Sequence, residues 1–337
     1  MNMRKKYFLF FCVFVCLSCS RKDYEHVECA IKTIKDNIRI LDTNMIKEVF
    51  NPCDIYSVGD DILVINRDQN GKIIYRYDSE MSFKEAFFSY GRAGNEFVFI
   101  DNCLKYGSDS TLYLYTNWFN CTEFSLDEHG IMVTDNFHIL TEVQNNVILL
   151  NDSLLFYEAL LNDDPFHVYN YVTNEVVCGF GEFPESSIIP ETDADRDNIC
   201  LCNSVYDGSG KKLVSFYESI PIIRIYDMET YDLIREIQIV DSEKQTTSLN
   251  DYYEEKGIIY FLRPMLVGEY IYTLYLNARS DSKFIEKTVL IKMDLNGNII
   301  ATFTLDRFCP IYTISDDGMF YGIAVSDGEY LFCKTKL

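Results

Sequence analysis

The residues best placed to do chemistry lie in a short glycine-hinged turn that holds one basic and one acidic side chain. Arg92 and Glu96 could together hold a polar ligand, because one offers hydrogen-bond donors and the other acceptors. The alternative is structural: Gly91 and Gly94 permit backbone angles closed to other residues, Phe97 fills a core, and Arg92 pairs locally with Glu96. We favour the structural interpretation and treat the five residues as a candidate binding or blade-junction motif.

Metal binding has two weak candidates. The alternating carboxylates of residues 193–198 resemble a calcium loop, but Asn198 stands where that loop needs glycine and Ser204 where it needs glutamate. We favour an acidic, solvated loop instead. Cys200 and Cys202 share one face of a strand, yet a zinc site needs a second pair of ligands that we do not find. We therefore expect no metal ligands and no cofactor, with calcium kept as the alternative.

Catalysis has little support in the sequence. The four histidines, His26, His129, His138 and His167, are scattered along the chain. The Gly-x-Ser-x-Gly nucleophile elbow and the His-Glu-x-x-His zinc signature are both missing. We name no catalytic residue and favour a protein that is not an enzyme.

The N-terminus predicts export. Residues 1–18 contain three basic residues and then an apolar run of twelve, which is too short to cross a bilayer as a helix, since that takes about 20 residues. Ser18 precedes Cys19, as in a lipoprotein signal peptide whose cysteine becomes the acylated N-terminus. The aliphatic residue usual three places before that cysteine is here Cys16. An ordinary secretory signal and an uncut anchor stay open as alternatives, and each places the mature chain outside the cytoplasm.

Charge narrows the partners. The formal net charge is −22, and residues 1–18 carry three positive and no negative charges, so their removal makes it −25. Such a surface repels phosphate backbones and anionic headgroups. We expect no nucleic-acid partner and no membrane contact beyond the N-terminal lipid. Nine cysteines remain after Cys19, an odd and irregular set that makes a poor disulfide framework.

The rest of the chain is a series of repeats. Short apolar runs alternate with Asp, Asn and Gly from residue 37 onward, and units of about 40–50 residues of this kind indicate propeller blades. The Asn-Gly pairs at 70–71 and 296–297 predict hairpins, the first with a type I′ turn. Residues 179–184 repeat the glycine-aromatic pattern of residues 91–97 at the same place in their unit. Six units can be counted.

The sixth unit is one strand short at the C-terminus, and an open ring would leave exposed sheet edges. Residues 37–41 alternate correctly, so we expect this N-terminal segment to supply the missing outer strand. The sequence thus predicts an all-β fold: a six-bladed β-propeller of four-stranded antiparallel blades, its last blade closed by an N-terminal strand. The domains are a signal peptide at 1–18, a tether at 19–36 and the propeller at 37–337.

The cysteine after the signal, the turn and the six-unit count together resemble the TolB-like six-bladed β-propeller lipoproteins of Bacteroides and its relatives. The family turn often reads Gly-basic-Gly-Pro-Gly-Glu-Phe, so Gly91, Arg92, Gly94, Glu96 and Phe97 match in kind, whereas the residues at 93 and 95 depart from it. The resemblance covers nearly the whole mature chain. It implies the fold and adds little on function, because most members have no assigned activity.

These observations favour a lipid-anchored propeller that binds or scaffolds a protein, peptide or glycan partner. We expect it in the cell envelope as an outer-membrane lipoprotein, either periplasmic or surface-exposed. The alternative function is a calcium-dependent hydrolase or lactonase of the six-bladed propeller type, in which carboxylates from several blades would hold the metal. Fold alone does not decide between these classes.

Overall fold

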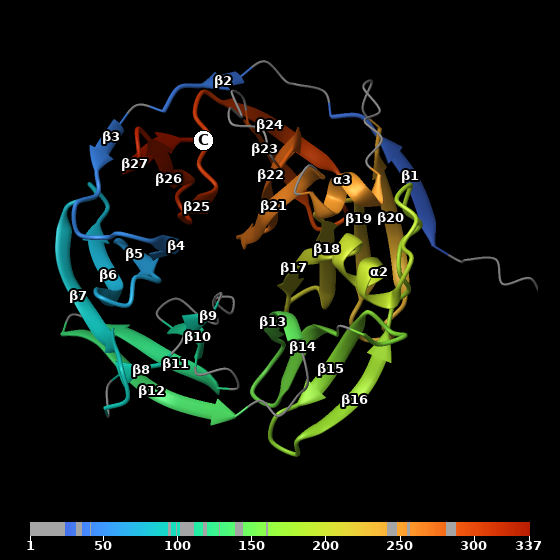
Figure 1. The fold of residues 1–337 in the computed structure, drawn as a ribbon, viewed down its shortest axis with the longest axis horizontal. Coiled ribbons are helices and arrows are strands. Elements are labelled where there is room, and N and C mark those ends of the chain that lie inside the picture. Colours follow the sequence, from blue (N-terminus) through green and yellow to red (C-terminus); the bar gives the residue numbers. More distant parts are fainter. Residues whose placement is uncertain are drawn as a thin grey trace, which may run out of the picture.

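The computed structural model is a ring of six antiparallel sheets around a central axis (Figure 1). It describes residues 24–31, 36–40, 42–93, 96–98, 100–101, 111–116, 120–127, 129–138, 144–159, 161–240, 248–254, 257–280 and 288–337. The predicted six-bladed β-propeller is confirmed, and so is the closure of its last blade by an N-terminal strand.

The first three blades follow the chain from the axis to the perimeter. Blade 1 consists of β4 (Pro52–Val58), β5 (Asp61–Asn66), β6 (Lys72–Asp78) and β7 (Phe83–Tyr90), with the short β8 (Glu96–Phe97) parallel to β7. Blade 2 consists of β9 (Ile100–Asp101), β10 (Thr111–Thr116), β11 (Asn120–Asp127) and β12 (Gly130–His138). Blade 3 consists of β13 (Gln144–Leu149), β14 (Leu154–Ala159), β15 (Phe166–Asn170) and β16 (Glu175–Phe180).

The last three blades also take strands from the N-terminus. Blade 4 consists of β17 (Cys202–Asp207), β18 (Lys212–Tyr217), β19 (Ile222–Asp227) and β20 (Leu233–Ile239), and follows the short helix α2 (Asp193–Ile199). Blade 5 follows α3 (Leu249–Tyr253) and consists of β21 (Ile258–Val267), β22 (Tyr270–Arg279), β23 (Thr288–Asp294) and β24 (Ile299–Leu305). Blade 6 consists of β25 (Ile311–Ile314), β26 (Met319–Ser326) and β27 (Glu329–Lys336), completed by β3 (Asp42–Met45).

The N-terminal segment forms a belt along the perimeter of blades 4, 5 and 6 (Figure 1). β1 (Glu25–Cys29) pairs in parallel with β20, β2 (Asp36–Ile38) pairs in parallel with β24, and β3 pairs antiparallel with β27. The predicted closing strand at residues 37–41 was therefore placed too early. Part of the predicted tether is also a strand, because β1 lies within residues 19–36.

The core is divided among the interfaces between blades. Among the described residues, six buried hydrophobic clusters lie one between each pair of neighbouring blades. Because a middle strand is covered by a blade on either side, it buries both of its faces: every residue of β5 is buried. The perimeter strands are the opposite, and β16 is largely exposed. The middle strands therefore appear in the sequence as continuous apolar runs, whereas the outer strands show little regular alternation of apolar and polar residues.

A repeated turn ends the third strand of blades 1 to 5. The last residue of that strand accepts, through its side-chain oxygen, a hydrogen bond from the backbone N–H two residues further on, at 2.7 to 3.0 Å. These residues are Asp78, Asp127, Asn170, Asp227 and Asp294. Such Asx turns explain why the sequence repeats an acidic or amide residue at this place.

The turn predicted at the first Asn-Gly pair is different from expectation. A type I′ turn needs positive φ at both central residues, but neither Asn70 nor Gly71 has it. Instead the Gly71 N–H donates to the Asp68 carbonyl at 3.1 Å, and the Asp68 carboxylate accepts from the Asn70 N–H at 3.0 Å. The hairpin was therefore predicted at the right place with the wrong turn type.

An ion pair ties the ring together near its axis. Arg263 of β21 reaches past blade 6 to blade 1, where its Nη1 lies 2.6 Å from Asp54 Oδ1 and its Nη2 donates to the Cys53 carbonyl at 2.6 Å. The Tyr312 hydroxyl of β25 donates to the Arg263 carbonyl at 2.7 Å. Blades 5, 6 and 1 are thus joined by polar contacts as well as by their clusters.

Candidate binding site

The structure places the predicted turn motif at the perimeter of blade 1. The Gly91 N–H donates to the Phe97 carbonyl at 3.1 Å, and the Glu96 carboxylate folds back to accept from the Ala93 N–H at 2.9 Å. A Cβ at Gly91 would lie 1.9 Å from Glu96 Oε2, so the fold-back needs glycine there. Arg92 is exposed, and the described part of this turn contains no ion pair between Arg92 and Glu96.

Phe97 fills the interface between blades 1 and 2. Its side chain is buried, and its ring lies 5.7 Å from those of Phe88 and Phe124. This packing supports the junction interpretation of the motif. Gly94 and the predicted lipidation residue Cys19 lie outside the described residues.

The carboxylates of residues 193–198 form neither a calcium loop nor a solvated loop. They lie in α2, where the Asp195 carboxylate accepts from the Thr192 N–H at 2.7 Å and completes a capping box. Asp197 is buried and accepts from the Leu161 N–H. Across the part of the chain that the structure describes, no group of three or more His, Cys, Asp or Glu side chains could hold a metal ion.

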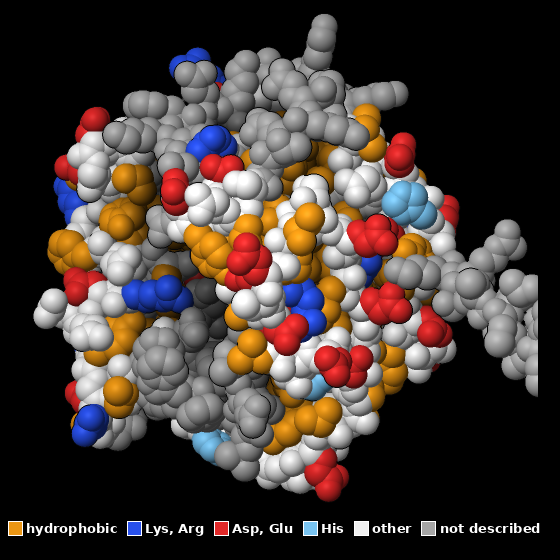
Figure 2. Space-filling view, turned by 45° about the vertical axis from the view of Figure 1, so that its right-hand side comes forward, with side chains coloured by type: hydrophobic (Ala, Val, Ile, Leu, Met, Phe, Trp, Pro, Cys, Tyr) orange, Lys and Arg blue, Asp and Glu red, His pale blue; other side chains and the backbone are white. Residues whose placement is uncertain are grey.

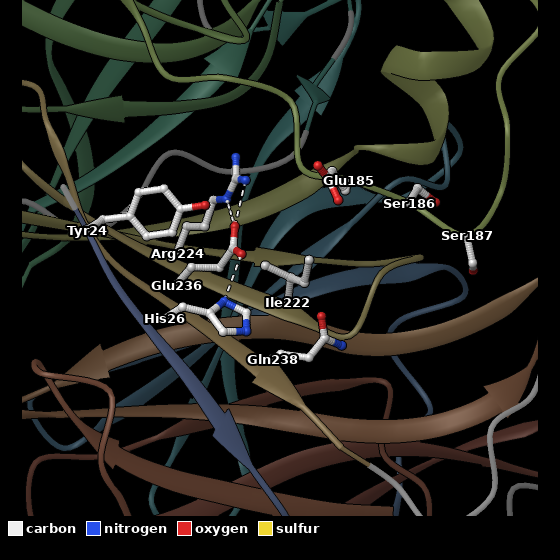
Figure 3. Close-up of a pocket in the computed structure, with 9 residues that line it drawn as sticks. All are labelled: Tyr24, His26, Glu185, Ser186, Ser187, Ile222, Arg224, Glu236 and Gln238. Carbon is white, nitrogen blue, oxygen red and sulfur yellow. Dashed lines mark hydrogen bonds and ion pairs between the residues drawn. The ribbon is translucent and has the colours of Figure 1, made fainter. Parts of the chain in front are cut away.

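A pocket of about 550 Å³ opens at the perimeter of blade 4, and we call it the rim pocket (Figure 3). Its walls come from the belt, from the segment that follows β16, and from β19 and β20. The lining residues are Tyr24, His26, Glu185, Ser186, Ser187, Ile222, Arg224, Glu236 and Gln238.

Strand alternation explains how blade 4 supplies its part of the lining. Successive side chains point to opposite faces, so Arg224 of β19 and Glu236 of β20, which pair across the two strands, share one face. The neighbouring residues along each strand, Ile225 after Arg224 and Ile237 after Glu236, point to the opposite face. They belong to the apolar cluster between blades 4 and 5. The same strands thus build a core on one side and a polar wall on the other.

The centre of this wall is a buried ion pair. Arg224 is 2% exposed, and its Nε and Nη2 lie 2.7 and 2.6 Å from Glu236 Oε2. A further Arg224 nitrogen donates to the Glu182 carbonyl. The other oxygen of Glu236 lies 3.2 Å from His26 Nδ1 on the belt. Glu236 therefore holds the arginine on one side and the belt on the other.

Two buried tyrosines complete the surroundings of this ion pair. The Arg224 guanidinium lies 5.9 Å from the centre of the Tyr217 ring. Burial raises the pKa of Tyr226 to about 12, so its phenol is neutral at physiological pH. Arg224 and Glu236 are therefore the charged groups of this inner wall.

The arrangement suits binding better than nucleophilic chemistry. A serine nucleophile needs a base within hydrogen-bond reach, but Ser186 and Ser187 lie on the wall opposite His26 (Figure 3). The pocket instead presents a guanidinium, carboxylates, an amide, hydroxyls and an imidazole around a small space. These groups can donate and accept many hydrogen bonds to one ligand.

The surface around the pocket is mixed. Figure 2 brings this side of the ring forward and shows acidic, basic and hydrophobic side chains interspersed over the visible described residues. Large apolar patches mark stable protein interfaces and basic stripes mark nucleic-acid sites. The described residues that are visible on this face form neither kind of patch.

Sequence reasoning missed this pocket. The signal available was Arg224 within the apolar run of β19, since a charge on a buried strand needs a partner. Glu236 follows on the next strand, but His26 is 210 residues from Glu236 and lies in a segment taken for a tether. Only the folded belt brings the three together.

Comparison with known proteins gives the fold. No family model matches the sequence, and no curated protein matches it. A solved structure of a member of the DUF4221 family from Bacteroides vulgatus is similar, with a TM-score of 0.62, 11% identity, and coverage of 86% of this chain and 94% of that one. A "putative exported protein" from Bacteroides fragilis has a TM-score of 0.54 at 10% identity, with coverage of 93% and 99%. At such identities the likeness shows a shared fold alone.

The sequence resemblance is therefore supported in its fold, while TolB-like membership and lipidation stay predictions. Within the described residues, no helix has the length and apolar character needed to cross a bilayer.

Proposed function

We propose that the protein is an exported, lipid-anchored propeller of the cell envelope that binds a small, hydroxyl-rich ligand, such as the sugar units of a glycan, in the rim pocket. The observation that carries this proposal is the Arg224–Glu236 pair in the wall of an open pocket. Removing two charges from water is costly, and hydrophobic replacements often stabilise a protein as well or better. Such a pair is therefore better explained by recognition than by stability.

The lining favours a neutral polyol over an anion. Arg224 is neutralised by Glu236, and Glu185 adds a further negative charge at the mouth, so the pocket offers no net positive charge to a phosphate or carboxylate. Among the lining groups, the Glu185 carboxylate can accept hydrogen bonds from two neighbouring hydroxyls, and the Ser187 hydroxyl can donate or accept one. The volume of about 550 Å³ falls in the usual range for small-ligand sites.

Binding should appear as ligand-dependent stabilisation. With the folded protein and a panel of neutral oligosaccharides, acidic oligosaccharides and peptides, we expect neutral sugars to raise the melting temperature, because a ligand at 100 times its Kd adds about 2.7 kcal/mol. Tyr24→Ala and Glu185→Gln should each weaken the affinity about tenfold or more, measured by calorimetry, since both side chains line the pocket.

The matched control is Tyr253→Ala, which removes an exposed tyrosine away from the pocket lining and should leave the affinity unchanged. If only the peptides raise the melting temperature, the ligand of the rim pocket would be a protein or peptide and not a sugar. A response to no member of the panel, or equal losses in the control, would remove the basis for the proposal.

The anchor can be tested separately. If Cys19 is acylated, Cys19→Ala should move the protein from the membrane fraction to the soluble fraction, because each buried CH₂ of a lipid chain contributes about 0.8 kcal/mol to membrane binding. Fractionation followed by immunoblotting measures this. Cys29→Ala is the control, since Cys29 lies in β1, and it should stay with the membrane. Retention of the Cys19→Ala variant in the membrane would contradict the lipoprotein assignment.

A further inference from the structure

Two buried cysteines of blade 6 lie against the same glycine. Cys309 precedes β25, Cys333 is in β27, and Gly322 of β26 lies between them. A Cβ built on Gly322 would lie 2.7 Å from Cys309 Cβ and 3.0 Å from its sulfur. The Cys309 side chain therefore occupies the space that a side chain at position 322 would fill.

Cys333 faces this same space. It is the direct partner of Gly322 across the antiparallel pair of β26 and β27. Residues paired in this way point to one face, with Cβ positions about 4.5–5.5 Å apart. Cys309 and Cys333 are both fully buried and belong to one cluster.

The pKa shifts of the two thiols agree with this proximity. Hydrogen bonding between them raises the pKa of Cys309, with burial acting in the same direction, and lowers the pKa of Cys333. Opposite shifts of this kind fit a Cys309 thiol that donates to the Cys333 sulfur. The structure records both residues as free thiols.

We infer that Cys309 and Cys333 form a disulfide bond when the chain folds in an oxidising compartment. This inference rests on the export part of the proposed function, because disulfides form and persist in such compartments. Each thiol loses one proton and one electron as the S–S bond forms. The disulfide of a thiol–disulfide oxidoreductase accepts the two electrons and two protons and becomes a dithiol.

The bond would fasten the segment before β25 to β27, within the blade that closes the ring. The other six described cysteines would stay reduced: Cys29, Cys53, Cys121, Cys178, Cys200 and Cys202. A single bond of this kind is compatible with the expectation that the cysteines make a poor disulfide framework.

The chain offers a direct test. No Lys or Arg lies between Arg307 and Lys334, so trypsin releases both cysteines in one peptide. The full mature chain is refolded with glutathione disulfide. It is then unfolded in denaturant that contains N-ethylmaleimide, which labels every free thiol, and digested with trypsin. We expect a peptide without the label and lighter by two hydrogens than its reduced form. A second protease that cuts at aspartate should leave two fragments joined until a reductant is added.

Stability gives a second readout. A reductant should lower the melting temperature of the refolded parent and leave that of Cys309→Ala/Cys333→Ala unchanged, while Cys121→Ala should respond like the parent. If the double variant fails to fold, the labelling result alone decides. Two labels on the peptide from correctly refolded protein would overturn the inference. A disulfide after refolding, but two labels in protein isolated from cells, would support the pair and contradict export.

Discussion

Removing residues 1–49 should open the ring, and the truncated protein should either aggregate or melt far below the parent. This deletion takes away β3, which pairs with the edge of β27, together with the buried Ile46 and Val49. Each of these two side chains contributes about 1.5–3 kcal/mol by its burial, and the bare strand edge invites association with other chains. Against a usual net stability of about 5–15 kcal/mol, the loss is large.

A shorter deletion separates the contribution of β1 from that of the rest of the belt. Removing residues 1–35 takes away β1 alone and leaves β2, β3 and the buried Ile40 in place. Because the side chains of β1 are half-buried or exposed, its loss should lower the melting temperature only slightly. Calorimetry and light scattering compare the two. Equal stability of both truncated proteins would show that β3 does not close blade 6.

Replacing Arg224 by methionine should cost about 3–5 kcal/mol of unfolding free energy, the usual result of leaving a buried charge without its partner. Glu236 would keep its burial but lose both guanidinium contacts, and the Glu182 carbonyl would lose its donor. The double variant Arg224→Met/Glu236→Met should recover most of the loss, because no isolated charge remains. Urea unfolding measures all three proteins.

The control is Lys211→Met, which breaks the exposed pair with Glu229 and should leave the unfolding midpoint unchanged. A loss of similar size in the control would mean that Arg224 is not special. A double variant no more stable than Arg224→Met would show that packing, rather than the unpaired carboxylate, accounts for the effect.

The architecture could be predicted because blades bury their middle strands on both faces. That burial produces the short apolar runs, and the Asx turn at residues such as Asp78 and Asp227 produces the punctuation between them. The closing strand could not be located in this way. β3 reads Asp-Thr-Asn-Met and its side chains at Asn44 and Met45 are exposed, so it has no apolar pattern, whereas residues 37–41 do.

The candidate site was beyond sequence reasoning for a different reason. Its charged centre was visible as single residues, since Arg224 interrupts an apolar strand, but its partners depend on topology. His26 reaches the site only because β1 runs parallel to β20. The helix α2 could have been recognised, because Thr192 and Asp195 stand at the spacing of a capping box. The carboxylate pattern of a metal loop led the interpretation elsewhere.

The belt has a consequence for how the chain is interlocked. The polypeptide that forms blades 1 to 4 begins with strands that belong to the sheets of blades 5 and 6: β2 pairs with β24, and β3 pairs with β27. A single cut between blades 4 and 5 would therefore yield two fragments that still share two strand pairings and two blade interfaces. While any one of these contacts persists, the partner surfaces of the other contacts stay at high effective concentration relative to each other. The two fragments would stay associated after the cut. To separate them, the strand pairings of β2 with β24 and of β3 with β27 must break together with both blade interfaces.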